Sequence, residues 1–127
     1  MIKYHINIKD LKLKHGRIDS IWVVEKGQEY IGVILKATNT SDDDVYISSS
    51  DFKLINSNGE ELSPCIPMVK IWDNYDYLCG TKLVKGGTKT GIVVFKNPNT
   101  NNSNLIFKME KFHWFSDNEI HEIRLKK

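Results

Sequence analysis

The sequence predicts an all-β protein, an antiparallel sandwich or barrel. Three observations predict this class. Short segments in which polar and apolar residues alternate recur along the whole chain. Polar turn signals separate these segments at intervals of about 8–12 residues, and no segment has helical periodicity. With 127 residues, 40% of them hydrophobic, we expect residues 1–127 to form a single domain with one core.

The N-terminal segment alternates over residues 2–8, which predicts a half-buried strand. After Asp10 the apolar residues change parity, to Leu11 and Leu13, and such a slip predicts a β-bulge near Lys9 and Asp10. Gly16 and Arg17 are expected to begin a connection. Residues 18–24 are consistent with either a second short strand or an irregular crossing segment.

The middle of the chain predicts a central strand followed by short ones. Residues 29–38 carry apolar side chains on both faces, as a strand between two others does. A polar turn at 39–44 leads to short strands at 45–47 and 51–55. The pair Asn58-Gly59 predicts a two-residue type I′ hairpin before a return strand at 60–62.

The C-terminal half contains one long connection and the remaining strands. Pro64 and Pro67 end the return strand, and residues 64–79 then form the longest connection. Residues 80–84 lead to a turn at Lys85-Gly86-Gly87. The sheets are completed by a buried strand at 90–95, a polar loop at 97–104 and two strands, at 105–109 and 119–125.

Two motifs make the chain resemble a known family. The first is the stretch from Tyr30 to Asn39 with its polar turn and the following DFKLINSNGEELSP; the second is GGTKTGIVVF with its final apolar strand. In order and spacing these are similar to the immunoglobulin-like domain of unknown function that is common in Gram-positive bacterial lipoproteins. The resemblance covers residues 3–109. It implies an immunoglobulin-like β-sandwich of about seven or eight strands, outside the cell in most members, with no established catalytic residues.

Several classes of function find little support in the residues. No apolar run reaches the ~20 residues of a membrane helix. Read from Met1, the sequence has no secretion signal and predicts a cytoplasmic protein, whereas a leader before Met1 would make it extracytoplasmic. Asp42, Asp43 and Asp44 lack the spacing of a calcium loop, and we expect no metal or cofactor. No serine or cysteine stands in a catalytic motif, so we expect no enzymatic activity.

Two cysteines and a set of lysines leave alternatives open. Cys65 and Cys79 can form a disulfide in an oxidising compartment or remain two thiols in the cytoplasm. The lysines of residues 3–14 would join those near the C-terminus in a basic stripe if the first and last strands were neighbours. Because edge lysines more often prevent aggregation, we do not expect nucleic acid to be the partner.

The long connection is the best candidate for a binding site. Large aromatic residues alternate there with acids, as in the energetic centres of protein interfaces. The predicted contacts are Trp72, Asp73, Tyr75, Asp76 and Tyr77, joined by Phe112 and Trp114 from a second aromatic segment. A structural alternative is that Trp72 and Tyr75 cap the open end of the sandwich.

The sequence therefore favours a non-catalytic module that binds a protein with a basic surface. Residues 37–79 carry eight acidic and two basic residues, and this charge would steer such a partner. One alternative is a cytoplasmic phage or mobile-element inhibitor that blocks a host defence or nucleic-acid enzyme by occupying its surface. A third is an extracytoplasmic small-molecule or metal-binding domain, which would need a pocket lined by Trp22, Trp72 or Trp114, or a paired His site. The oligomeric state does not follow from the sequence.

Overall fold

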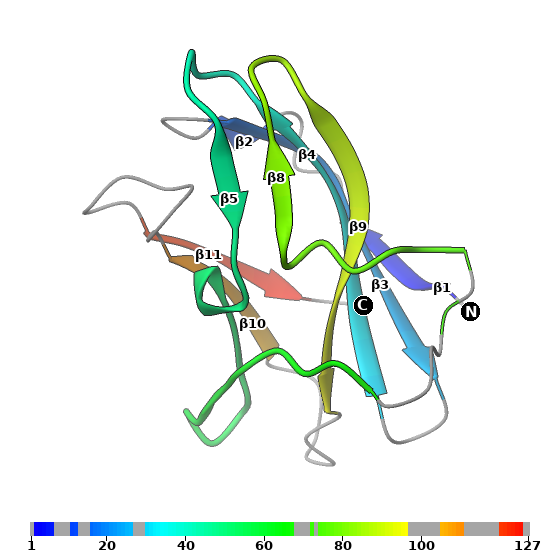
Figure 1. The fold of residues 1–127 in the computed structure, drawn as a ribbon. Coiled ribbons are helices and arrows are strands. Elements are labelled where there is room, and N and C mark those ends of the chain that lie inside the picture. Colours follow the sequence, from blue (N-terminus) through cyan, green and yellow to red (C-terminus); the bar gives the residue numbers. More distant parts are fainter. Residues whose placement is uncertain are drawn as a thin grey trace.

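In a computed structural model, the protein is an antiparallel β-sandwich in which two layers enclose a hydrophobic core (Figure 1). The structure describes residues 2–6, 11–12, 16–26, 30–67, 72, 74–96, 105–110 and 120–125. Within these ranges there are eleven strands, of which four are only two or three residues long. The seven longer strands form the sandwich that the sequence predicts.

The first sheet has the order β1-β3-β4-β9. Its strands are β1 (Ile2–Ile6), β3 (Gly16–Lys26), β4 (Tyr30–Asn39) and β9 (Thr88–Lys96), and the short β2 (Leu11–Lys12) shares an edge of β3 with β1. β4 is central, as predicted. The sequence predicted that Gly16 and Arg17 begin a connection and that residues 18–24 form a short strand or an irregular segment. The structure instead has one long strand here, because β3 pairs with β4 from Gly16 to Lys26. The predicted bulge at Lys9 and Asp10 lies outside the described residues.

The second layer contains a four-stranded sheet and a small ladder. The sheet has the order β11-β10-β6-β7, with β6 (Phe52–Ile55), β7 (Glu61–Leu62), β10 (Leu105–Glu110) and β11 (Ile120–Leu125). The ladder pairs β5 (Val45–Ile47) with β8 (Thr81–Leu83). Between β5 and β6 lies a single 3₁₀ turn, η1 (Ser49–Asp51), which was not predicted. Ser48 and Asp51 close a capping box around it, because each side chain accepts a backbone N–H of this turn.

The hairpin between β6 and β7 differs from the prediction. The Gly59 N–H donates to the Asn56 carbonyl, and the Asn56 N–H donates to the Glu60 carbonyl, so the loop has three residues rather than two. Gly59 takes the left-handed conformation, with φ of +83°. The Asn56 side chain explains the difference: its Oδ1 accepts the N–H groups of Asn58 and Glu60, which starts the turn one residue earlier.

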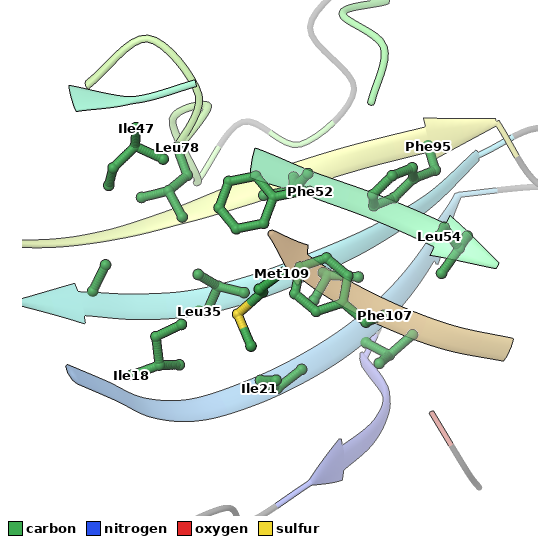
Figure 2. Packing of buried hydrophobic residues seen from close by; sticks show 14 of the residues in the cluster. Ile18, Ile21, Leu35, Ile47, Phe52, Leu54, Leu78, Phe95, Phe107 and Met109 are labelled. Carbon is green, nitrogen blue, oxygen red and sulfur yellow. The ribbon is translucent and has the colours of Figure 1, made fainter. Parts of the chain in front are cut away.

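The core lies between the inward faces of the two layers (Figure 2). Three phenylalanines join the sheets, since Phe52 of β6 stacks on Phe107 of β10 at 5.7 Å and Phe95 of β9 meets Phe107 edge-on at 6.2 Å. The inward residues of β4, Ile31, Val33, Leu35 and Ala37, are all buried in this core, on the parity that the sequence predicts.

Asn39 joins two turns at one end of the sandwich. It is fully buried, and its Nδ2 donates to the carbonyls of Asp43 and Leu83. Its Oδ1 accepts from the N–H and hydroxyl of Ser41. Its backbone bonds to Gly86 and Gly87, so one residue connects the turn after β4 with the turn between β8 and β9.

Candidate protein-binding face

The long connection runs along the edge of β9 that faces away from β4. The Cys65 N–H donates to the Val94 carbonyl, the Leu78 N–H donates to the Ile92 carbonyl, and the Ile92 N–H donates to the Asp76 carbonyl, at 2.8–3.0 Å. Residues 64–67 and 74–79 therefore cover a strand edge that would otherwise be unpaired (Figure 1).

Gly91 permits this close approach. A Cβ at Gly91 would lie 3.0 Å from the Cα and Cβ of Leu78 and 3.1 Å from the Asp76 carbonyl oxygen. A side chain at position 91 would therefore push the connection away from β9. The connection can follow its observed path only because residue 91 is a glycine.

The connection lays aromatic side chains over the outer face of the first sheet. On this face Val24, Ile34, Ile92 and Val94 form a second buried cluster, separate from the main core. Cys65 and five half-buried aromatic residues pack against it, and we call these five the aromatic face: Trp22, Tyr30, Trp72, Tyr75 and Tyr77. The sheet is thus covered on both sides, which explains why β4 carries apolar residues at both parities.

The structure brings some of the predicted site residues together. Trp72, Tyr75 and Tyr77 belong to the aromatic face, and Asp76 is exposed beside them. Asp73, Phe112 and Trp114 lie outside the described residues. Tyr30 was not predicted for the site, and Trp22 was predicted only as a lining residue of the alternative small-molecule pocket. The sequence signal for Tyr30 was its position in β4, where it shares the outward face with Ile34.

Trp72 carries an unusual polar group. Its indole N–H is buried, and the described part of the chain offers it no hydrogen-bond acceptor. An unpaired buried donor costs about 1–3 kcal/mol relative to a paired one. The packing of the ring against the outer cluster offsets this cost.

The two cysteines are free thiols on opposite faces of the first sheet. Cys65 packs on the outer cluster and Cys79 on the main core. Burial raises the pKa of Cys65, although nearby Lys96 lowers it in part. Burial, followed by the negative charge of Asp51, raises the pKa of Cys79 to about 12. Both thiols are therefore protonated at neutral pH, the form that is the weaker nucleophile and metal ligand.

Two ion pairs lie near the turns that Asn39 connects. Asp44 pairs with Lys82 at 3.3 Å, and Asp42 with Lys85 at 3.1 Å. Across the described residues, no three His, Cys, Asp or Glu side chains lie together as a metal site requires. β1 pairs with β3 in one sheet and β11 pairs with β10 in the other, so among the described residues the first and last strands are not paired with each other. Lys9, Lys14, Lys126 and Lys127 of the predicted basic stripe lie outside the described residues. No helix in the described ranges is long and apolar enough to span a membrane.

The residues of the family motif have structural roles. Asn39 connects two turns, Asp51 caps η1, Asn56 and Gly59 shape the hairpin, and Gly91 admits the long connection. Each role uses the side chain, or its absence, within the fold. These motif residues therefore serve to specify the sandwich.

Comparisons with solved structures agree on the fold. The yjhA protein of Bacillus subtilis is 15% identical and matches with a TM-score of 0.69 over 97% of this chain and 100% of its own. A β-sandwich protein of Clostridium difficile is 13% identical, with a TM-score of 0.59 over 95% and 92% of the two chains. The ycdA protein of Bacillus subtilis, described as a candidate lipoprotein, is 10% identical, with a TM-score of 0.65 over 92% of this chain but only 38% of its own.

The sequence comparisons identify a family. No curated protein matches the chain. The model of the domain of unknown function DUF4352 matches residues 4–120, nearly the whole sequence. The chain therefore belongs to the DUF4352 family.

Proposed function

We propose that the protein is a non-catalytic binding module that recognises another protein through its aromatic face. The observation that carries this proposal is the gathering of five half-buried aromatic side chains on one side of the first sheet. Tyr and Trp combine a large apolar surface with a polar tip and few rotatable bonds, so they lose little entropy when a partner covers them.

The accessible area of the aromatic face limits the binding free energy that it can contribute. A Trp or Tyr buries about 150–250 Å² when fully covered, so five rings with about a quarter of that area still accessible present roughly 250 Å². At about 25 cal/mol per Å², covering this area yields roughly 6 kcal/mol, comparable with the cost of association. The aromatic face would therefore be the centre of a larger interface of about 800 Å² per partner.

The charge beside the aromatic face favours a basic partner. Asp76 is exposed next to Tyr75 and Tyr77. Residues 37–79 have six more acidic than basic residues, but Asp42 and Asp44 pair with lysines and Asp51 is buried, so the charge argument depends on Asp76. An exposed carboxylate beside the contact accelerates association with a positively charged partner, and the effect weakens as salt rises.

Two compartments are considered for the partner. One similar structure is described as a candidate lipoprotein, which favours a partner at the cell envelope. The alternative is the cytoplasmic inhibitor of phage or mobile-element origin, whose partner would be a host enzyme with a basic cleft. The two proposals share the aromatic face and differ in where the complex is found.

Affinity capture from the source cells, fractionated into envelope and cytoplasm, tests the proposal. We expect one stoichiometric partner, which the double variant Trp72→Ala/Tyr75→Ala no longer binds. The control variant Tyr46→Ala removes a tyrosine that is 54% exposed on β5, outside the aromatic face, and should still bind the partner. Circular dichroism must show that the double variant is folded. A partner that both variants retain equally would contradict a role for the aromatic face.

A further inference from the structure

A hollow opens into the side of the sandwich between η1 and the two arms of the long connection. Its volume is about 580 Å³, within the range of about 300–1,000 Å³ that small-molecule sites occupy. Its walls come from the end of β5 with the start of η1, from Ile66, and from Cys79 with Gly80. In Figure 1 the end of β5 and η1 lie beside the start of β8.

The rim of the hollow is apolar and exposed. Tyr46 is 54% exposed and Ile66 is 70% exposed, and both line the hollow although they belong to different segments. Among the described residues only two other large hydrophobic side chains are exposed, Val84 and Ile120, and neither lines it. Single exposed apolar residues are ordinary, whereas two exposed apolar residues that line the same concavity indicate a binding surface.

The interior of the hollow combines apolar and hydroxyl groups without a formal charge. Ile47 is fully buried, and two serines line the hollow beside it: Ser48, whose hydroxyl is bonded to Ser50, and the exposed Ser49. The carboxylate of Asp51 is buried close enough to Cys79 to act on that thiol. A negative charge behind the wall disfavours an anionic ligand.

The hollow is already formed in the fold. The Gly80 N–H donates to the Ile47 carbonyl at 2.7 Å, which fixes one wall against the other. The capping box of Ser48 and Asp51 fixes η1. Gly80 has φ of +88°, and the space where a Cβ would stand is empty, so the rim stays open there. A preformed site avoids the entropic cost of ordering its walls.

We propose that this hollow binds an uncharged small molecule with an apolar body and a hydroxyl or carbonyl group. The apolar body lies between Tyr46 and Ile66, and the polar group bonds to the Ser49 hydroxyl, because the Ser48 hydroxyl is already bonded to Ser50. None of the residues of the aromatic face lines the hollow, so this inference stands apart from the proposed function.

Nile red, an uncharged dye with an apolar ring system and a carbonyl group, is a suitable probe. We expect saturable binding of one dye per chain. We also expect bound dye to slow the alkylation of Cys79 by N-ethylmaleimide, while Cys65 on the opposite face reacts unchanged; mass spectrometry of the two peptides reads both rates. The anionic dye 8-anilinonaphthalene-1-sulfonate should bind at least tenfold more weakly.

Two isoleucines provide a matched pair of variants. Ile66→Ser removes an exposed side chain from the rim, and Ile120→Ser removes one that is 57% exposed on β11. We expect about a tenfold loss of Nile red affinity for Ile66→Ser and no change for Ile120→Ser. Ser49→Trp, at an exposed position, should fill the hollow and abolish binding even if Ile66→Ser fails to fold.

Three results would overturn the inference. They are the absence of saturable Nile red binding to the native protein, equal losses in the two isoleucine variants, and dye binding that leaves the alkylation rate of Cys79 unchanged.

Discussion

Replacing Asn39 with alanine is the sharpest test of how the sandwich is held together. Asn39 is fully buried and makes four side-chain hydrogen bonds, two as donor and two as acceptor. Asn39→Ala removes all four and leaves the buried carbonyl of Leu83 without this donor.

The magnitude follows from the setting of each bond. The bonds to the carbonyls of Leu83 and Asp43 measure 3.0 and 2.8 Å, and each is worth about 1 kcal/mol net. The two bonds from Ser41 lie partly in solvent, where water replaces them, and contribute about 0.5 kcal/mol each. Asn39→Ala should thus lower the free energy of unfolding by about 3 kcal/mol and Tm by about 12 °C.

Urea unfolding and calorimetry measure this loss, with Asn74→Ala as the control. Asn74 is exposed, and its replacement should change the free energy of unfolding by less than about 0.5 kcal/mol. Asn39 also pairs through its backbone with Gly86 and Gly87, so Asn39→Ala should speed hydrogen exchange at both turns. A loss below about 1 kcal/mol would refute the view that Asn39 joins the two turns.

Three further predictions concern the first sheet and its cover. Gly91→Ala should cost about 1–3 kcal/mol and speed amide exchange at Leu78 and Ile92, because its Cβ would meet Leu78 at 3.0 Å; unchanged exchange would contradict this. Trp72→Phe removes a buried unpaired donor and keeps a ring, so the free energy of unfolding measured in urea should stay equal or rise. A fall of more than about 1 kcal/mol would contradict this. Because the pKa of Cys79 is raised to about 12 in the fold, its contribution to stability is fully present below about pH 9 and is lost between about pH 9 and 12. The free energy of unfolding should therefore fall by up to about 1.4 kcal/mol per pH unit in this range. Cys79→Ala should make this fall with pH less steep, and an unchanged dependence on pH would contradict the prediction.

Much of the fold could be predicted from local patterns. Alternation gives the face that each residue of β4 occupies, and Val33 and Ile34 indeed lie in different clusters on opposite sides. Apolar residues at both parities predicted that β4 is a central strand, and in the structure they also match a sheet that is covered on its outer face. The identity of that cover could not be predicted, because it depends on the contact of residues 64–79 with the edge of β9, far away in the sequence.

Side-chain competition explains the local errors. The Asn-Gly pair suggested a two-residue loop, but the Asn56 side chain captures two N–H groups and draws the turn to three residues. The 3₁₀ turn was signalled by the spacing of Ser48 and Asp51, the pattern of a capping box. For the candidate site, aromatic composition led to Trp72 and Tyr75, whereas Trp22 comes from a distant strand that only the folded chain brings beside them.

Site-specific photo-cross-linking tests the central claim, that a protein partner binds the aromatic face, most directly. Benzoylphenylalanine is placed at Tyr75 in one version of the protein and at Tyr46, which is 54% exposed outside the face, in another, and both are irradiated in the source cells. We expect one cross-linked species of defined mass from position 75, diminished by excess unlabelled protein, and none of that mass from position 46. The same species from both positions, or from position 46 alone, would contradict it.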